Sequence, residues 1–347
     1  MGRLKGKSDL GTLAIVTRCR LWLTTAVVAL AGCAGPFPQS TLRPRSDFGR
    51  AIDHLFTDIF WWAVVVFVLV ETLLLVALIR FRHREGRPAP KPTHGHTALE
   101  IGWTLAPAVI LVLVAVPTVR TIFATAGDAP PDALKIDVIG HQWWWEYKYP
   151  ALGVVTANEM HVPVGRPVQV SITSADVIHS FWAPALGGKR DAIPGHETRI
   201  GFRADSVGEY PGQCAEFCGK SHATMGLRVI VDADSAFETW AKAEQGGSAT
   251  PAPGSPAERG KAVYSRSACL ACHTIQGVSP GVIGPNLTHV GSRTTIAGGM
   301  FPNDSAHLAR WIADATALKP GSLMPRMQPP LSDGDIALIV AYLQSLK

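Results

Sequence analysis

A twelve-residue stretch near the middle of the chain, CAEFCGKSHATM at 214–225, combines several side chains that bind soft metals. Cys214 and Cys218 are four positions apart, His222 follows the second thiol by four positions, and Met225 follows the imidazole by three. Thiolate and thioether ligands select copper or iron–sulfur chemistry, whereas hard cations prefer oxygen ligands. The alternative is a disulfide between the two cysteines with a surface histidine nearby. The residue types and their spacing favour a soft-metal site.

A second motif, CLACH at 269–273, is the attachment signature of a c-type heme. The two thiols, Cys269 and Cys272, add to the vinyl groups, and the adjacent imidazole, His273, becomes the proximal iron ligand. The competing interpretation is a redox dithiol, which is weaker because the surrounding sequence lacks a βαβ pattern. The motif therefore predicts a covalently bound heme c.

Methionine is a common sixth ligand of an electron-transfer heme, because it raises the reduction potential and closes the iron to small molecules. Two candidates lie close together, Met324 and Met327. Met324 is preferred because Pro325 follows it directly and a terminal helix comes next, so this segment resembles the distal loop of small bacterial cytochromes c. Met300 is a third, more distant candidate. Each of the three could instead be an ordinary thioether of the core.

The composition limits the class of protein. With 347 residues the chain has room for two or three domains, and its hydrophobic content of 47% indicates that part of it lies in lipid. The formal net charge of +5 is too small to indicate nucleic acid binding. Four of the six cysteines belong to the two motifs above, so no structural disulfide is required.

Residues 1–32 are predicted to be an export signal, because Arg18 and Arg20 precede an apolar run, 21–30, that is too short to span a bilayer. Small residues precede Cys33, as in a bacterial lipobox. We therefore expect Cys33 to be the lipid-bearing first residue of the mature protein. An ordinary signal peptide with an incidental cysteine is the alternative.

Two apolar segments, 59–79 and 101–119, are each about long enough to cross a hydrocarbon core, and they predict a transmembrane hairpin within residues 33–130. The segment between them is rich in arginine and lysine, so we expect this loop in the cytoplasm and both outer ends on the exported face. Glu100 begins the second span. Acidic residues in membrane spans are functional candidates, but the helix macrodipole also favours an acid at a helix N-terminus.

Residues 131–240 contain short runs of alternating polar and apolar residues, such as 134–139, separated by Gly and Pro. This pattern predicts an antiparallel β-sandwich or barrel. The metal-binding stretch lies between its last two strands. His179 is expected in the loop after the 168–173 strand, from which it can reach the same end of the sandwich.

The chain after the sandwich divides into a linker and a helical unit. Residues 241–255 are rich in small residues and proline and have no periodicity, which predicts a linker. Residues 256–347 have a helical pattern. Ser332 and Asp335 form an N-terminal capping signal for an amphipathic last helix.

The order of these features resembles subunit II of the heme-copper cytochrome c oxidases, with a fused C-terminal cytochrome c as in the caa-type bacterial enzymes. The ligand spacing of the metal loop, GHQWWWEY at 140–147 and LEIGWTLAP at 99–107 all match that family in the same order. The resemblance covers essentially the whole chain after the signal. It implies a multidomain fold with an N-terminal transmembrane α-helical hairpin, an all-β cupredoxin-like sandwich and an all-α class I cytochrome c domain.

The resemblance also implies a dinuclear copper centre, CuA, in which the thiolates of Cys214 and Cys218 bridge two copper ions. Rigid ligands on a sandwich rim keep the bond lengths nearly constant on reduction. The carboxylate of Glu216 is implied to bind Mg²⁺ at the contact with the catalytic subunit. The remaining copper ligands are two imidazoles, a thioether and a carbonyl oxygen: His179 and Met225 on one copper, and His222 and the backbone carbonyl of Glu216 on the other.

Two further residues match family positions. Trp143 corresponds to the aromatic residue at which the family takes up electrons from a donor cytochrome, but it could be a packing residue, since neighbouring side chains on a strand point to opposite faces. A fused heme can also shift electron uptake away from Trp143. Glu100 corresponds to a glutamate near the mouth of a proton channel in the neighbouring subunit.

The resemblance predicts the electron-entry subunit of a terminal oxidase in the bacterial inner membrane, with its copper and heme domains on the exported face. Its partners would be catalytic subunit I, other oxidase subunits, a cytochrome c donor and membrane lipid. Dioxygen would be reduced to water in the catalytic subunit, with proton pumping. One alternative is a CuA-containing nitric oxide reductase subunit. Another, from a different class, is a copper-delivery protein.

Overall fold

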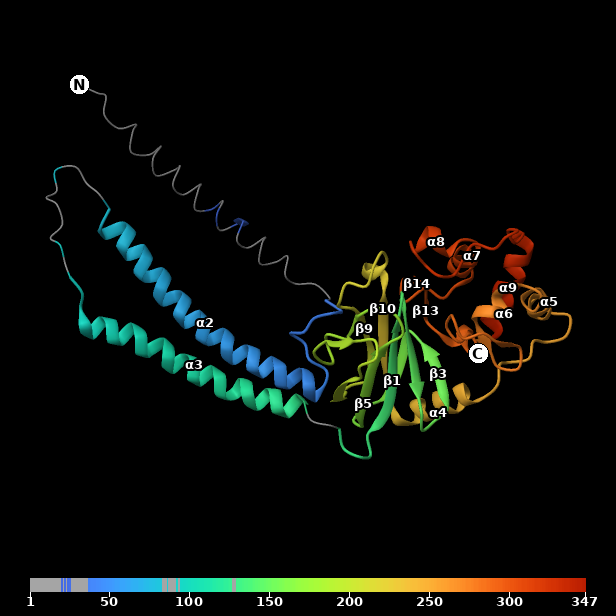
Figure 1. Cartoon of the computed structure of the whole chain (residues 1–347), viewed down its shortest axis with the longest axis horizontal. Helices are drawn as coiled ribbons and strands as arrows, with labels where there is room; N and C mark the ends of the chain where they lie inside the picture. The colour runs from blue at the N-terminus through green and yellow to red at the C-terminus, as the bar shows by residue number, and fades with distance from the viewer. Residues whose placement is uncertain are drawn as a thin grey trace, which may run out of the picture. The chain divides into compact units, whose positions relative to one another are not determined.

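In the computed structural model of this chain, residues 37–82, 86, 92, 94–126 and 129–347 are described, together with residues 20, 22, 24 and 25 (Figure 1). Apart from these four positions, the predicted signal peptide 1–32 lies outside the described residues, as does Cys33. Arg84, Arg87 and Lys91 of the predicted cytoplasmic loop also lie outside them.

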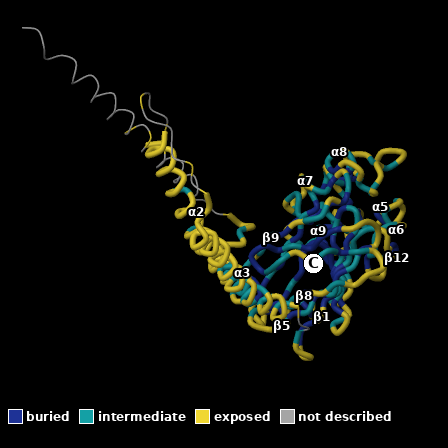
Figure 2. Tube along the Cα trace, turned by 60° about the vertical axis from the view of Figure 1, so that its left-hand side comes forward, coloured by how far each residue is buried: buried dark blue, intermediate teal, exposed yellow. Residues whose placement is uncertain are grey.

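Two long helices, α2 (Asp47–Arg80) and α3 (Thr97–Ala126), run side by side as a hairpin (Figure 1). Each extends beyond the predicted apolar span, and both are long and apolar enough to cross a membrane. Nearly all of their side chains are exposed (Figure 2), as expected of surfaces that face lipid. Ser46 caps α2: its hydroxyl accepts a hydrogen bond from Gly49 N (2.9 Å) and donates one to Leu186 O (2.5 Å), which ties the helix to the β-domain.

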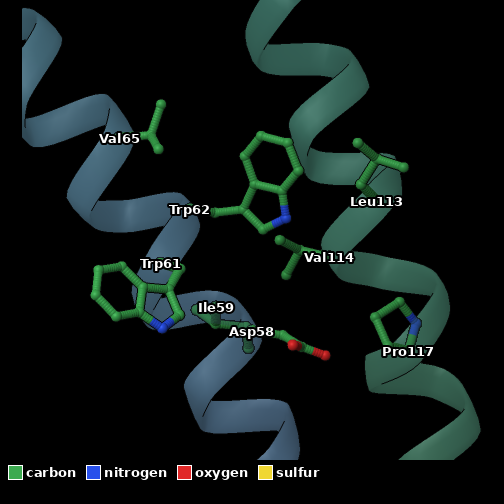
Figure 3. Close-up of a pocket in the computed structure, with 8 residues that line it drawn as sticks. All are labelled: Asp58, Ile59, Trp61, Trp62, Val65, Leu113, Val114 and Pro117. Carbon is green, nitrogen blue, oxygen red and sulfur yellow. The ribbon is translucent and has the colours of Figure 1, made fainter.

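A mostly apolar pocket of about 350 Å³ lies where the two helices face each other near the start of α2 (Figure 3). Trp62 projects from α2 toward Val114 and Pro117 of α3, whereas Trp61 points away from that helix (Figure 3). Two tryptophans at one end of a span are typical of an interfacial aromatic belt. Asp58 is the acidic residue of this lining.

The middle of the chain folds into two five-stranded sheets that pack as a sandwich, with one hydrophobic core between them. Burial alternates along the strands, as in β5, where every second side chain is buried. The first sheet has, in spatial order, β3 (Val154–Ala157), β2 (Trp144–Tyr149), β1 (Leu134–His141), β5 (Pro167–Ser174) and β8 (Thr198–Arg203). The second has β4 (Glu159–Pro163), β10 (Gly226–Asp232), β9 (Gly208–Cys214), β6 (His179–Trp182) and β7 (Arg190–Ala192).

The sandwich differs from the sequence prediction in two details. Each sheet contains one parallel pair, β1 with β5 and β4 with β10, because strands that are distant in sequence return to neighbouring positions. The other strand pairs are antiparallel, as the sequence pattern predicted. His179 was expected in a loop, but it is the first residue of β6, because its side chain is fully buried and its backbone pairs with Ala192 of β7.

A helix, α4 (Asp234–Gln245), follows the last strand and packs on the sandwich. Its Trp240 stacks on His161 with ring centroids 4.3 Å apart, and His161 Nδ1 lies 2.7 Å from Asp232 Oδ2. Because these contacts hold the helix on the sandwich, regular structure continues to Gln245. The stretch without regular structure is thus shorter than the predicted 241–255 linker.

The C-terminal part is mainly helical. Ser332 caps the last helix by accepting a hydrogen bond from Asp335 N (3.1 Å), as the sequence predicted. The first and last helices of this domain pack together, with the rings of Tyr264 and Tyr342 5.6 Å apart. The α-helices are α5 (Pro256–Tyr264), α6 (Cys269–Cys272), α7 (Ser305–Ala313), α8 (Ala315–Leu318) and α9 (Asp333–Ser345). Short ladders join β11 (Thr274–Ile275) to β12 (Ser279–Pro280) and β13 (Thr295–Ile296) to β14 (Phe301–Pro302), and one 3-10 turn is η2 (Val290–Ser292).

Candidate metal and heme sites

The metal loop joins β9 to β10 at one end of the sandwich. Cys214 is the last residue of β9, the 3-10 turn η1 (His222–Thr224) lies within the loop, and β10 starts directly after Met225. Strand β6 pairs with β9, with Phe181 opposite Cys214. This pairing brings His179, at the start of β6, to the first thiol.

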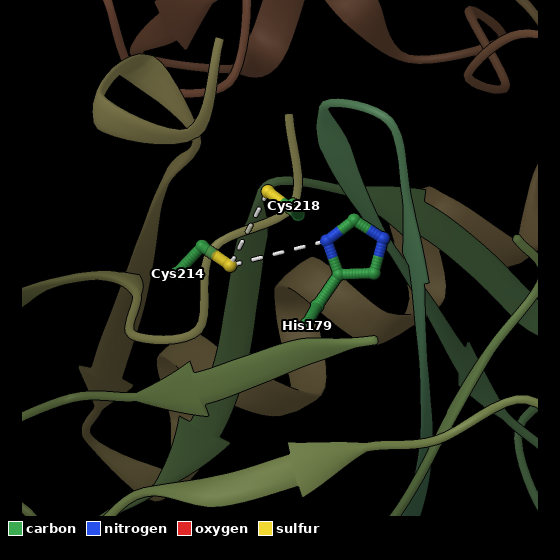
Figure 4. Close-up of side chains that lie close together, drawn as sticks. All are labelled: His179, Cys214 and Cys218. Atoms are coloured by element: carbon green, nitrogen blue, oxygen red, sulfur yellow. Dashed lines mark hydrogen bonds between the residues drawn. The ribbon is translucent and has the colours of Figure 1, made fainter. Parts of the chain in front are cut away.

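Cys214, Cys218 and His179 form the centre of the site and are all buried (Figure 4). The two Sγ atoms lie 3.7 Å apart, and His179 Nδ1 lies 3.9 Å from Cys214 Sγ. The imidazole ring points its Nδ1 edge at the thiols (Figure 4). Three soft or borderline donors therefore face one small volume.

The other predicted ligands surround the same two sulfur atoms. His222 Nδ1 lies 3.6 Å and Met225 Sδ 3.8 Å from Cys218 Sγ. The backbone oxygen of Glu216 lies 3.2 Å from Cys214 Sγ. All six predicted copper-binding residues are thus brought together. Two thiols, two imidazoles, a thioether and a carbonyl form a sulfur-rich donor set that suits copper.

Asp176 holds the His179 ring in this orientation. Its Oδ1 lies 2.7 Å from His179 Nε2, and its Oδ2 accepts a hydrogen bond from Gln142 N (2.7 Å). Burial lowers the pKa of His179, but the hydrogen bond to Asp176 and the contact with Cys214 outweigh burial and raise it. A carboxylate behind a ligating imidazole fixes the tautomer and increases the basicity of the ligand.

The two thiols contact each other, so the charge on one affects the pKa of the other. Their contact lowers the pKa of Cys214 to about 3 and raises the pKa of Cys218, because a thiolate on one sulfur is stabilised by the proton on the other. Metal binding needs both thiolates, so a bound metal takes the place of that proton.

The Glu216 carboxylate is partly exposed at the surface. It is 44% exposed and lies 3.7 Å from Lys189 Nζ. It is therefore accessible to an external partner, while the backbone oxygen of the same residue faces Cys214.

The heme motif borders a cavity of about 300 Å³ that is lined mainly by apolar atoms. Cys269, Cys272 and His273 line one part of its wall, and Met324 and Met327 both line another. Met300 is not part of the lining. Of the three methionines considered as the sixth ligand of the heme iron, Met324 and Met327 therefore remain as candidates.

His273 and Arg293 fit a heme in this cavity. His273 Nδ1 lies 2.8 Å from Pro285 O, which places the ring proton on Nδ1 and leaves Nε2 free to bind iron. Burial lowers the pKa of His273 and so favours the neutral imidazole that ligation requires. Arg293 also lines the cavity, and its buried Nε has no hydrogen-bond partner among the described residues. A heme carboxylate is an acceptor that would satisfy it.

Trp143 lies between the two sites. Its indole Nε1 donates a hydrogen bond to Cys218 O (2.9 Å), and the same residue lines the heme cavity. It is 8% exposed, whereas the next tryptophan, Trp144, is half-buried and stacks on His141 with centroids 4.2 Å apart. Trp145 is fully buried in the core. Trp143 is thus covered by the C-terminal domain and is not open to a large external partner.

Glu100 lies in the first turn of α3, outside both sites. Its Oε1 accepts a hydrogen bond from His96 N (3.1 Å), which is the contact of a helix N-terminal cap. This geometry agrees with the capping alternative. The role at a proton channel stays a prediction.

Comparison with known proteins identifies the family. The chain is 35% identical over 344 residues to cytochrome c oxidase subunit 2 of Alkalihalophilus pseudofirmus, covering 94% of this chain and 99% of that protein. The chain belongs to the cytochrome c oxidase subunit II family. Cytochrome c oxidase subunit 2 of Bacillus subtilis is 32% identical, with 96% of this chain and 99% of that protein covered.

The domain matches follow the same order as the fold. Family models match residues 45–121 (cytochrome c oxidase subunit II, transmembrane domain), residues 152–233 (cytochrome c oxidase subunit II, periplasmic domain) and residues 257–347 (cytochrome c). The predicted fold class is confirmed, and the chain is a membrane protein with a periplasmic domain. The crystal structure of the periplasmic domain of subunit II of cytochrome oxidase from Bradyrhizobium japonicum is 37% identical, with 35% of this chain and 96% of that chain covered and a TM-score of 0.33.

Membership in the family implies copper in the β-sandwich and heme in the C-terminal domain. The sulfur-rich donors around Cys214 fit the first, and the apolar cavity with the free Nε of Arg293 fits the second. Sequence reasoning missed Asp176 and Arg293. Asp176 could have been found because a carboxylate three residues before a ligating histidine is a plausible partner for it. No motif in the sequence near Arg293 indicates that this residue lines the heme cavity.

Proposed function

We propose that this chain is the electron-entry subunit of a terminal respiratory oxidase in the bacterial inner membrane. It would accept electrons from a cytochrome c through its own heme c and CuA centre and pass them to the catalytic subunit, which reduces dioxygen to water with proton pumping. The observation that supports this most strongly is Trp143, which lines the heme cavity and is hydrogen-bonded to the backbone of Cys218.

The proposed copper ligands are the six residues whose donor atoms gather around the two thiols. Strand β9 and β6 hold Cys214 and His179, and the loop that leads into β10 supplies the rest. A dinuclear copper centre supplies one-electron chemistry at a site whose ligands move little. The set is His179, Cys214, Glu216 through its carbonyl, Cys218, His222 and Met225.

The proposed heme residues are Cys269 and Cys272 for covalent attachment, His273 as proximal ligand and Met324 as sixth ligand. A heme c with histidine and methionine ligands supplies one-electron transfer without binding small molecules. Arg293 would neutralise a heme carboxylate inside the cavity. Because Trp143 is buried, electron uptake from the external donor is assigned to the exposed side of the heme domain, with Trp143 serving the internal step.

The carboxylate of Glu216 is proposed to bind Mg²⁺ together with the catalytic subunit. It is partly exposed on the metal loop, and hard carboxylate oxygens suit this ion. The dioxygen site is assigned to the catalytic subunit, so this chain alone would carry electrons without turnover.

Gas consumption by the purified complex tests the proposal. With reduced cytochrome c as donor, the complex should consume dioxygen, and this chain isolated in detergent should become reduced without consuming any gas. A complex that consumes nitric oxide and no dioxygen would instead identify a nitric oxide reductase. Metal transfer to an apo-protein without electron transfer would identify a copper-delivery protein.

A further inference from the structure

Lys319 buries an ammonium group at the boundary between the sandwich and the heme domain. It follows α8, its backbone N donates to Ala315 O (2.8 Å), and the residue is only 3% exposed. None of the ion pairs formed by the described residues includes it. Burying an unpaired charge is costly, so the position calls for a compensating set of contacts.

Three backbone carbonyls supply those contacts. Lys319 Nζ donates to Trp143 O (2.7 Å), Thr224 O (3.0 Å) and Ala297 O (2.8 Å). An ammonium has three donors and no acceptor, so all its hydrogen-bonding capacity is used. Two acceptors belong to the sandwich and one to the heme domain. A single side chain therefore joins the turn that carries Trp143, the metal loop and the heme domain.

The surrounding backbone leaves little room for another arrangement. A Cβ atom on Gly298 would lie 2.7 Å from Lys319 Nζ and 3.1 Å from Trp143 O. Gly226, directly after the last predicted copper ligand, donates from its backbone N to Gly298 O (2.8 Å). A Cβ on Gly321 would lie 2.6 Å from the indole ring of Trp143. The two domains thus meet backbone to backbone around the ammonium.

The carbonyls that Lys319 binds belong to residues next to the electron-transfer groups. Thr224 immediately precedes Met225, and Trp143 is hydrogen-bonded to Cys218 O. We infer that Lys319 is a positioning residue, which holds the metal loop and Trp143 at a fixed place against the heme cavity. This inference rests on the proposed function of the two sites.

A second polar contact attaches the domains independently of Lys319. The carboxylate of Glu159, 2% exposed on β4, accepts hydrogen bonds from the backbone N and the hydroxyl of both Thr294 and Thr295, at 2.7–3.1 Å. Loss of the Lys319 ammonium should therefore leave the domains attached on the Glu159 side. The effect should be confined to the side of the interface that contains the metal loop and Trp143.

The test uses Lys319→Met in the full chain, loaded with copper and heme. After a flash of light reduces the heme at the expense of a sacrificial electron donor, one electron passes from the ferrous heme to the oxidised copper centre, and no bond is made or broken. We expect this transfer to slow by about tenfold or more, while both optical spectra are retained. Amide exchange at Gly226, measured by mass spectrometry, should accelerate by a similar factor, because its acceptor Gly298 is no longer held.

Lys242→Met is the matched control, because it removes the same charge from an exposed position on α4. The inference would be overturned if Lys319→Met and Lys242→Met showed the same rate of electron transfer and the same rate of amide exchange at Gly226. If Lys319→Met fails to retain heme, Gly298→Ala replaces it as the test variant, because the added Cβ displaces the ammonium and keeps its charge. An unchanged rate of electron transfer and an unchanged rate of amide exchange in Gly298→Ala would also overturn the inference. Failure of the proposed function is distinguishable, because the unsubstituted chain would then show no transfer between the two centres.

Discussion

In the metal loop, donor atoms from His179, His222 and Met225 already lie between 3.6 and 3.9 Å from a cysteine sulfur, whereas the heme thiols border an apolar cavity of about 300 Å³. The donor atoms of the first site are brought together by the pairing of strands, and metal binding there releases thiol protons. The second is incomplete without a large apolar group to fill it. The two sites should therefore respond differently when their groups are removed.

The largest expected effect is on the stability of the heme domain. Replacing Cys269 and Cys272 by Ala prevents covalent attachment and leaves the cavity without its filling, at a cost on the order of several kcal/mol, which is comparable with the total stability of a small domain. Calorimetry should show loss of the unfolding transition of the heme domain, with the copper spectrum retained. An unchanged transition would contradict the assigned role of the cavity.

Cys218→Ser tests the metal loop. We expect it to abolish the mixed-valence copper signal in the electron paramagnetic resonance spectrum, because a hydroxyl cannot replace a bridging thiolate. The heme c spectrum and the unfolding of the heme domain should stay unchanged. A persistent copper signal would refute the ligand set.

Met324→Ala should lower the midpoint potential of the heme and allow carbon monoxide to bind, since loss of the sixth ligand opens the iron. Met327→Ala is the control, because both thioethers line the cavity. If carbon monoxide bound only to the Met327 variant, Met327 would be the sixth ligand instead of Met324.

Asp176→Ala should weaken copper binding by about 10–100-fold without removing the site, because the carboxylate orients His179 rather than contacting the metal. Competition with a copper chelator measures the change. Asp234→Ala removes an exposed carboxylate at the start of α4 and should leave affinity unaltered. Equal affinities in the two variants would exclude the positioning role.

A further effect is the pH dependence contributed by Lys319, whose pKa burial lowers to about 7 from 10.5. Below about pH 7 the amine is charged in both folded and unfolded states. Between about pH 7 and 10.5 the unfolded state binds more protons, so the free energy of unfolding should rise with pH, by at most about 1.4 kcal/mol per pH unit. Denaturant unfolding of the full chain in detergent should show this rise, and Lys319→Met should remove it. If the free energy of unfolding of Lys319→Met rose equally with pH, the rise would come from other titratable groups.

The sequence was sufficient where function depends on local spacing. The loop at 214–225, the CLACH motif and the Ser332 cap each lie within a few residues, so their geometry follows from local chain direction. The amphipathic strands also predicted the sandwich. The parallel pairs and the strand position of His179 depend on which distant segments become neighbours, and no local pattern carries that information.

The contacts between the domains could not be predicted for the same reason. Lys319 meets Trp143 across 176 positions of sequence, and Glu159 meets Thr294 across 135. The burial of Trp143 follows from this packing. Trp143 thus lies between the metal loop and the heme cavity, away from the exposed surface, and its role in electron uptake stays a prediction.

Time-resolved reduction of the whole complex tests the central claim most directly. Reduced cytochrome c is mixed with the fully oxidised complex, and the heme c and copper absorption bands are followed together. The heme c band should be reduced first, and the copper band should follow with a lag, since Trp143 is covered. Reduction of the copper band before the heme band would contradict the account.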